Sequence, residues 1–231
     1  MNFEWFPRFA GLIGSGLLVT VQLTLIAGLL GFALAIAVAL GSLSRNAILS
    51  AISTAYMTVI RGTPLLVQLY ILYYGVGSLR ASTPWIRHSF VWPILRDGFS
   101  YAVIALTLSV GAYAGEILRG GLRAVPKGEL EAAHALGMSQ FTIIRRIWLP
   151  RAVIAQLPVL AGSSVILLKS TALASTITVI DVLGALNLVR ADTYLTYEPL
   201  LVAAAMYLVL TLVIEWAFRK FEGRIPAKKA L

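Results

Sequence analysis

Cysteine is absent from this chain of 231 residues. Its absence excludes a disulfide framework, a thiolate metal site and a cysteine nucleophile. Charged residues are scarce as well, at 13%, whereas a soluble domain carries about 25%. Hydrophobic residues reach 59%, and they form blocks as long as the roughly 20 residues that a membrane-spanning helix needs. The composition therefore predicts an all-α membrane protein with a single domain over residues 1–231.

Catalytic residue sets are also missing. The two histidines are His88 and His134, and the chain has no zinc-protease histidine pair, no phosphate-binding lysine loop and no glycine-rich dinucleotide motif. A serine–lysine pair of the intramembrane protease kind would need Ser163 or Ser164 together with Lys169. A stand-alone membrane enzyme is therefore a less favoured alternative. A stand-alone secondary transporter is disfavoured too, because the sequence shows no inverted repeat.

The apolar blocks predict five membrane spans. Pro64 predicts a kink in the second span, because proline disfavours helical geometry at Thr63 and removes a backbone donor. Residues 78–98 predict a short interfacial helix in an external loop. Residues 170–196, rich in Ser, Thr and Gly, predict a re-entrant or external helical pair, since irregular backbone in a membrane must be covered by protein. The predicted spans are about 14–42, 50–77, 99–120, 151–168 and 198–218.

The distribution of lysine and arginine predicts the orientation of the chain. Twelve basic residues lie on the side of the connector between the third and fourth spans: Arg45, Arg119, Arg123, Lys127, Arg145, Arg146, Arg151, Arg219, Lys220, Arg224, Lys228 and Lys229. Five lie on the opposite side: Arg8, Arg80, Arg87, Arg96 and Arg190. Because basic loops stay in the cytoplasm, the N-terminus is expected outside and the C-terminus inside. This asymmetry accounts for the net charge of +9 without nucleic-acid binding.

The connector at about 128–150 has more structure than a tether between two spans requires. Proline and glycine break the chain before it, and Glu129 falls in a first helical turn, where the helix dipole favours an acid. Gly137 ends this helix and Ser139 can cap a second one. The small side chains allow close approach by another surface. On these residues alone the connector is either an amphipathic interfacial helix or a docking element for a soluble partner.

The motif spacing resembles one protein family along nearly the whole chain. Glu131-Ala132-Ala133, followed by Gly137, Ile147, Leu149 and Pro150, is similar to the EAA motif in permease subunits of ATP-binding-cassette (ABC) importers. Four further stretches resemble the polar amino acid branch of these permeases: residues 61–68, 111–116, 119–122 and 169–173. The loop at 87–92 is similar to that of opine and basic amino acid permeases.

This resemblance implies a fold, a location and a set of partners. The expected fold is the type I ABC importer permease fold, with about five transmembrane helices and a cytoplasmic coupling helix, in a bacterial inner membrane. Glu131, Ala132, Ala133 and Gly137 would couple the permease to its ATPase. The implied partners are two cytoplasmic ATPase subunits, a second permease subunit (identical or a sister chain) and an external solute-binding protein. No cofactor is expected in this chain, since ATP and Mg²⁺ would bind to the ATPases.

Charges inside a membrane are costly, so charged residues in the spans are expected either to pair or to line a substrate pathway. Arg61 and Glu116 either pair with each other or line the cavity, and Asp181 at the outer mouth is either a gate or a helix cap. The candidate pathway residues are Arg61, Glu116, Ser163, Ser164, Lys169 and Asp181. Permeases for cationic amino acids often carry an Asn-Glu pair where Ser163 and Ser164 stand. The predicted substrate is thus a polar amino acid of undetermined charge, and the alternative is another small solute, such as an opine or a sulfonate.

Overall fold

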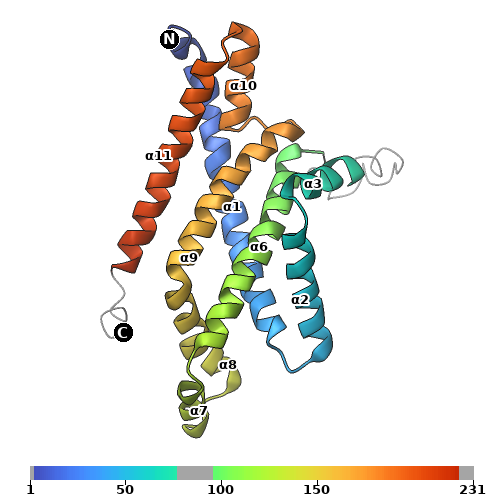
Figure 1. Cartoon of the computed structure of the whole chain (residues 1–231), viewed down its shortest axis with the longest axis vertical. Helices are drawn as coiled ribbons and strands as arrows, with labels where there is room; N and C mark the ends of the chain where they lie inside the picture. Colours follow the sequence, from blue (N-terminus) through green and yellow to red (C-terminus); the bar gives the residue numbers. More distant parts are fainter. Residues whose placement is uncertain (1–2, 77–95, 224–231) are drawn as a thin grey trace.

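The computed structural model describes residues 3–76 and 96–223, and within these ranges the regular structure is helical throughout. Long helices run side by side, with the N-terminus and α10 at one end and α7 and α8 at the other (Figure 1). The helices are α1 (Phe6–Ser42), α2 (Ala47–Gly62), α3 (Leu65–Tyr70), α6 (Gly98–Ala124), α7 (Lys127–Ala135), α8 (Gln140–Ile143), α9 (Leu149–Ser170), α10 (Val182–Thr193) and α11 (Tyr197–Glu222). Shorter helical turns cover Ile71–Gly75 (π), Ile144–Trp148 (π) and Thr171–Ile177 (3₁₀).

Four helical stretches are long and apolar enough to cross a membrane, and a fifth span results if α2 and the segment Leu65–Gly75 count as one. The prediction of about five transmembrane helices is therefore confirmed. The bounds differ in detail: α1 begins at Phe6, so the N-terminal aromatic segment continues directly into the first long helix. The interfacial helix predicted for residues 78–98 lies almost entirely outside the described residues.

The second predicted span is broken into two helices. The axes of α2 and the segment after it differ by 103°, because Thr63 is extended and Pro64 cannot continue the backbone hydrogen bonds. The carbonyls left open at the break are satisfied locally. The Gln68 side-chain amide donates to the Ile60 carbonyl at 2.8 Å and to the Thr63 carbonyl at 3.0 Å. The predicted kink is in fact a break of 103° between two helices, held by the Gln68 side chain.

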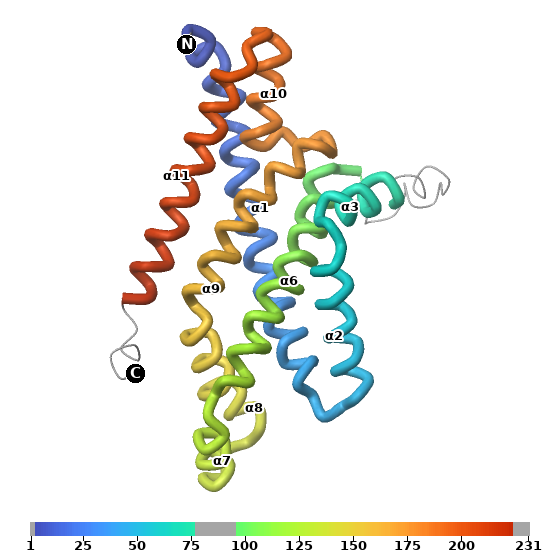
Figure 2. Tube along the Cα trace, in the orientation of Figure 1, coloured from blue at the N-terminus to red at the C-terminus, as the bar shows by residue number. Residues whose placement is uncertain are grey.

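Residues 170–196 form two helical segments, the 3₁₀ helix Thr171–Ile177 and α10. Thr178 joins them with a left-handed backbone, at φ 71°. The path of the tube shows this pair at the end of α9, before the chain enters α11 (Figure 2). The pair positions Asp181 at the start of α10, where its side chain caps the helix.

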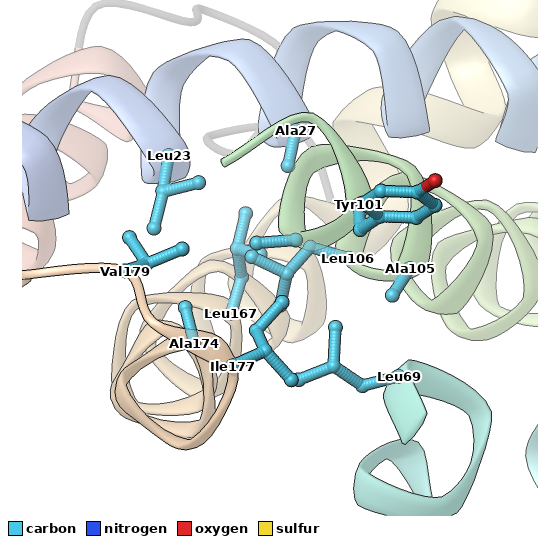
Figure 3. Packing of buried hydrophobic residues seen from close by; sticks show 11 residues of the cluster. Leu23, Ala27, Leu69, Tyr101, Ala105, Leu106, Leu167, Ala174, Ile177 and Val179 are labelled. Atoms are coloured by element: carbon cyan, nitrogen blue, oxygen red, sulfur yellow. The ribbon is translucent and has the colours of Figure 1, made fainter. Parts of the chain in front are cut away.

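The core brings together segments that are far apart in the sequence. Figure 3 shows apolar side chains from α1, α3, α6, α9 and the 3₁₀ helix converging in one cluster. Its labelled members are Leu23, Ala27, Leu69, Tyr101, Ala105, Leu106, Leu167, Ala174, Ile177 and Val179. The cluster therefore fixes the break after α2 against α6 and the end of α9.

Glycine allows the close approach of α1 to α6. A Cβ atom at Gly31 would lie 2.5 Å from Cβ and 2.6 Å from Cγ1 of Val110, a stiff β-branched side chain. Gly31→Ala is expected to lower the free energy of unfolding by about 2 kcal/mol through overpacking. Gly14→Ala on the same helix meets open space and is expected to be neutral or to stabilise by up to about 1 kcal/mol. Thermal unfolding in detergent compares the two variants, and equal melting temperatures would contradict this packing.

Candidate functional site

The predicted coupling segment is an ordered helical hairpin. α7 ends where the Gly137 amide donates to the His134 carbonyl at 2.9 Å and the Met138 amide donates to the Ala133 carbonyl at 3.1 Å. Gly137 has φ 73°, a left-handed backbone that glycine adopts without a steric penalty. Ser139 then accepts a hydrogen bond from the Thr142 amide and begins α8, as the sequence predicted.

His134 holds the two arms of this hairpin together. Its Nδ1 lies 2.7 Å from the Leu130 carbonyl oxygen, and its Nε2 lies 3.1 Å from Oε1 of Gln140. Both ring nitrogens are therefore used inside the hairpin. His134 is an exposed residue of the hairpin, and its ring also links the two arms.

The four predicted coupling residues do not share one surface. Glu131, Ala132 and Gly137 are exposed, whereas Ala133 is buried under the hairpin. Sequence reasoning missed two larger exposed side chains beside them, Leu136 at 82% exposure and Phe141 at 71%. The sequence contained a usable signal for these two residues, because large apolar side chains in a polar connector are usually covered by another surface.

Contacts at the base of the hairpin connect it to the membrane helices. The Glu129 carboxylate pairs with Arg151 on α9 at 3.1 Å, and the Trp148 indole N–H donates to the Leu122 carbonyl of α6 at 2.8 Å. A groove of about 650 Å³ lies between α7 and the start of α9, lined in part by Leu136. These contacts connect the coupling segment to both α6 and α9.

Arg61 and Glu116 form an ion pair, which was one of the two interpretations offered by the sequence. Arg61 Nη1 lies 3.0 Å from Glu116 Oε2, and Arg119 binds the other carboxylate oxygen, Oε1. The Arg61 guanidinium also lies 5.9 Å from the centre of the Tyr113 ring. The sequence did not identify Arg119 as the third member, although its i, i+3 spacing from Glu116 on α6 was a usable signal.

Ser163 and Ser164 line a second groove, of about 390 Å³, between α1, α6, α9 and α11. The Ser164 hydroxyl donates to the Leu160 carbonyl at 2.9 Å, so it is occupied within its own helix. Lys169 is exposed, and the ion pairs within residues 3–76 and 96–223 do not include it. It lies five residues beyond Ser164, about 140° around the helix, so α9 does not direct the two side chains toward each other.

Asp181 is fully buried and caps α10. It accepts hydrogen bonds from the Gly184 amide at 2.8 Å and from the Tyr207 hydroxyl of α11 at 2.8 Å. Next to it, Thr20 of α1 accepts from the Val182 amide at 3.1 Å. Burial raises the pKa of the Asp181 carboxyl above its ordinary value, and these hydrogen bonds partly offset the shift. Of the two roles considered for Asp181, the helix cap is the one its contacts display.

These features define a class of protein. Helices that can cross a membrane contain paired charges, and a helical hairpin at one end exposes apolar side chains. Among the described residues no three His, Asp or Glu side chains gather as a metal site would require. The apolar helices and the exposed hairpin suit a membrane transport subunit with a docking element.

The chain belongs to the family of binding-protein-dependent transport system inner membrane components, whose model matches residues 28–226. It is 41% identical over 220 residues to the octopine transport system permease protein OccM of Rhizobium radiobacter, covering 95% of this chain and 87% of that protein. It is 36% identical over 210 residues to the histidine/lysine/arginine/ornithine transport system permease protein HisM of Escherichia coli K12, covering 91% and 87%. Family members work with ATPase and solute-binding components.

Solved structures agree with this assignment. A chain of an amino acid ABC transporter crystallised with histidines superposes with a TM-score of 0.82 at 32% identity, over 97% of this chain and 99% of that one. The methionine ABC transporter MetNI, in an inward-facing conformation, matches with a TM-score of 0.75 at 18% identity, over 96% and 98%, which shows the fold alone. The predicted type I importer permease fold is thereby confirmed, and the chain is a transport subunit of an ABC importer.

Proposed function

We propose that this chain is the permease of an importer that carries a polar amino acid or an opine inward across the membrane. The observation that supports the substrate class most is the similarity to octopine and histidine permeases along more than nine-tenths of the chain. The exposed, rigid hairpin supports the coupling to an ATPase. Uptake by membrane vesicles that contain the complete transporter tests this proposal directly.

The proposed assembly has two permease chains, identical or sister, two cytoplasmic ATPases and an external solute-binding protein. ATP and Mg²⁺ bind in the ATPases. Glu131, Ala132 and Gly137 form part of the docking surface, and Ala133 packs beneath them. Closure of the ATPases moves α7, and the Glu129–Arg151 and Trp148–Leu122 contacts carry that movement to α9 and α6. The cavity then opens alternately to the two sides.

The proposed orientation has the N-terminus outside and the C-terminus in the cytoplasm. It is supported by the basic residues near the hairpin, Arg145, Arg146 and Arg151, and by the place of α10 at the opposite end of the bundle. In this orientation the proposed substrate pathway passes Ser163, Ser164 and the Arg61–Glu116 pair, whereas Lys169 lies near the outer end of α9 on its exposed face. Asp181 is buried near the outer end of the pathway, where it caps α10 and binds Tyr207 of α11.

The docking surface is tested with Leu136→Asp. An acid in place of an exposed apolar contact is expected to weaken ATPase binding by about 2 kcal/mol, roughly 30-fold. The measurement is the amount of ATPase that copurifies with the tagged permease in detergent. Tyr194→Asp is the matched control, because it places the same acid at a 91% exposed position at the opposite end, where a left-handed backbone tolerates aspartate.

If as much ATPase copurifies with Leu136→Asp as with the wild type, α7 is not part of the docking surface. Equal loss with Tyr194→Asp would show a general defect of the membrane subunit. Because Leu136 is exposed, the variant is expected to keep the melting temperature of the wild type, which separates loss of docking from loss of folding.

A further inference from the structure

The outward face of α11 is left open by the rest of the chain within residues 3–76 and 96–223. Only 11% of the most apolar stretch of this helix is buried, compared with 50% for α6, and Figure 1 shows α11 at the edge of the bundle. Its large exposed apolar residues follow helical spacing and share one face: Leu201, Leu208, Val209, Leu212, Val213 and Trp216. Large side chains suit contact with lipid tails, whereas close packing of membrane helices favours small residues.

The chemistry of this face changes at the end of α11. Trp216 is 60% exposed, and the Lys220 ammonium lies 4.8 Å from the centre of a Trp216 ring. The two residues are four apart in the sequence, so the ring and the cation lie on the same side of the helix. Tryptophan is enriched at the depth of the lipid head groups. The pair therefore stands where the apolar face of α11 meets the membrane surface.

The positive charge at this end of α11 is not balanced by the chain. The ion pairs within residues 3–76 and 96–223 do not include Lys220, whereas the neighbouring Arg219 pairs with Glu215 at 3.3 Å. The sequence from 219 to 231 contains a single acid, Glu222, against five basic residues: Arg219, Lys220, Arg224, Lys228 and Lys229. Lys220 is therefore a cation without an acidic partner, inside a basic segment.

We infer that Trp216 and Lys220 bind the head group of an anionic phospholipid, whose acyl chains lie along the outward face of α11. The Lys220 ammonium donates to the phosphate, and such charge-assisted hydrogen bonds are the strong ones. A zwitterionic lipid has the same phosphate but brings its own cation, so it does not offset the charge of this segment. Basic clusters at the end of a membrane helix attract anionic lipids. This inference goes beyond the proposed function and is independent of the solute that the chain carries.

Brominated lipids report which lipid touches Trp216, because bromine quenches tryptophan fluorescence on contact. The complete transporter is placed in nanodiscs of phosphatidylcholine with a minor fraction of phosphatidylglycerol. The bromines are either on the phosphatidylglycerol or on an equal amount of the phosphatidylcholine. Since the chain has five tryptophans, the Trp216 signal is the difference between the wild type and Trp216→Phe. Quenching of this signal is expected to be about fivefold more effective with brominated phosphatidylglycerol, the enrichment that one basic residue gives.

Variants at Lys220 assign the preference to this side chain, each measured against the same variant with Trp216→Phe. Lys220→Gln is expected to remove most of the preference and Lys220→Glu to reverse it, whereas Lys220→Arg keeps it, because a guanidinium also binds phosphate. Arg8→Gln is the matched control and is expected to leave the preference unchanged. Arg8 also lies over a ring, that of Phe9 at 4.9 Å, but it pairs with Asp192 at the opposite end of the bundle.

Equal quenching by the two brominated lipids would overturn the inference. No quenching of the Trp216 signal by either lipid would overturn it as well, because another protein subunit would then cover this face. A preference that stays unchanged in both Lys220→Gln and Lys220→Glu is a third contrary result, since the lipid would then respond to the overall charge of the transporter. Lys220 is exposed, so the variants are expected to keep the melting temperature of the wild type. Failure of the proposed function would alter none of these results, because the measurement needs no solute.

Discussion

Asp181→Ala is expected to lower the free energy of unfolding by about 3 kcal/mol, since it removes a helix cap and the carboxylate that accepts from the partly buried Tyr207 hydroxyl. The carboxylate accepts from the Gly184 amide, within α10, and from Tyr207, on α11. Without it the Tyr207 hydroxyl has lost its acceptor. The variant therefore loosens α10 from α11 as well as shortening α10. Thermal unfolding of the detergent-solubilised complex measures the loss.

Asp192→Ala is the matched control on the same helix. Asp192 pairs with Arg8 at 3.2 Å, and the two side chains are 46% and 70% exposed, so its loss is expected to cost no more than about 0.5 kcal/mol. Comparable losses at Asp181 and Asp192 would show that the buried contacts of Asp181 contribute little. Tyr207→Phe removes the same interhelical bond from the other side and is expected to cost about 1.5 kcal/mol.

The pH dependence of stability follows from the burial of Asp181. Burial raises the pKa of this carboxyl in the folded state, so the folded protein holds the proton more tightly than the unfolded chain does. Stability is then highest below the unfolded pKa, near 3.8, and falls as the pH rises from there through the folded pKa. Asp181→Asn keeps an oxygen to cap α10 and removes this titration. The stability of this variant is therefore expected not to show the same fall with rising pH.

The sequence was most informative where a local rule applies. Blocks of apolar residues as long as a bilayer predicted the spans, because only a helix satisfies its own backbone in lipid. Ser139 and Asp181 were recognised as possible caps because capping needs a side-chain acceptor a few residues before the helix amides. The Arg61–Glu116 pair followed from the cost of an isolated charge in a membrane. Each of these inferences needs only a few neighbouring residues or one physical penalty.

Contacts between distant segments were beyond such rules. Tyr207 bonds to Asp181 across 26 residues and Thr20 to Val182 across 162, and no periodicity in the sequence relates them. Pro64 predicted a kink, but the 103° turn also depends on how Gln68 satisfies the open carbonyls and how α3 packs against α6. The exposure of Leu136 and Phe141 could not be predicted either, because it depends on how α7 and α8 fold against each other.

The helix that leads into the coupling segment, α6, also carries the charged cluster. Glu116 and Arg119 lie on α6, two turns before the chain leaves α6 for the hairpin, and Trp148 binds the Leu122 carbonyl between them and that exit. Arg61 ties the cluster to the end of α2, just before the break. If the hairpin moves as proposed, α6 would carry that movement to the Arg61–Glu116 contact. The cluster is the site in the membrane where the effect of docking should be measured.

Glu116→Gln is expected to lower the free energy of unfolding by about 3 kcal/mol, because it leaves Arg61 and Arg119 facing each other without an acid. Removing one partner of a buried ion pair costs about 3–5 kcal/mol, and the lower end applies here because the Glu116 side chain is 28% exposed. Unfolding in mixed micelles with increasing sodium dodecyl sulfate measures the loss. Glu215→Gln breaks the exposed Glu215–Arg219 pair and is expected to cost no more than about 0.5 kcal/mol.

The double variant Arg61→Gln with Glu116→Gln distinguishes two effects of losing Glu116: the repulsion between Arg61 and Arg119, and the loss of the Arg61–Glu116 attraction. It removes one of the two opposed cations, so it is expected to recover about 1 kcal/mol relative to Glu116→Gln alone, as coupled neighbours do. A double variant as unstable as the sum of its singles would show that Arg61 and Glu116 act independently. In that case the 3.0 Å contact stores no coupling energy. The link from the hairpin through α6 to α2 would then have to run through apolar packing instead.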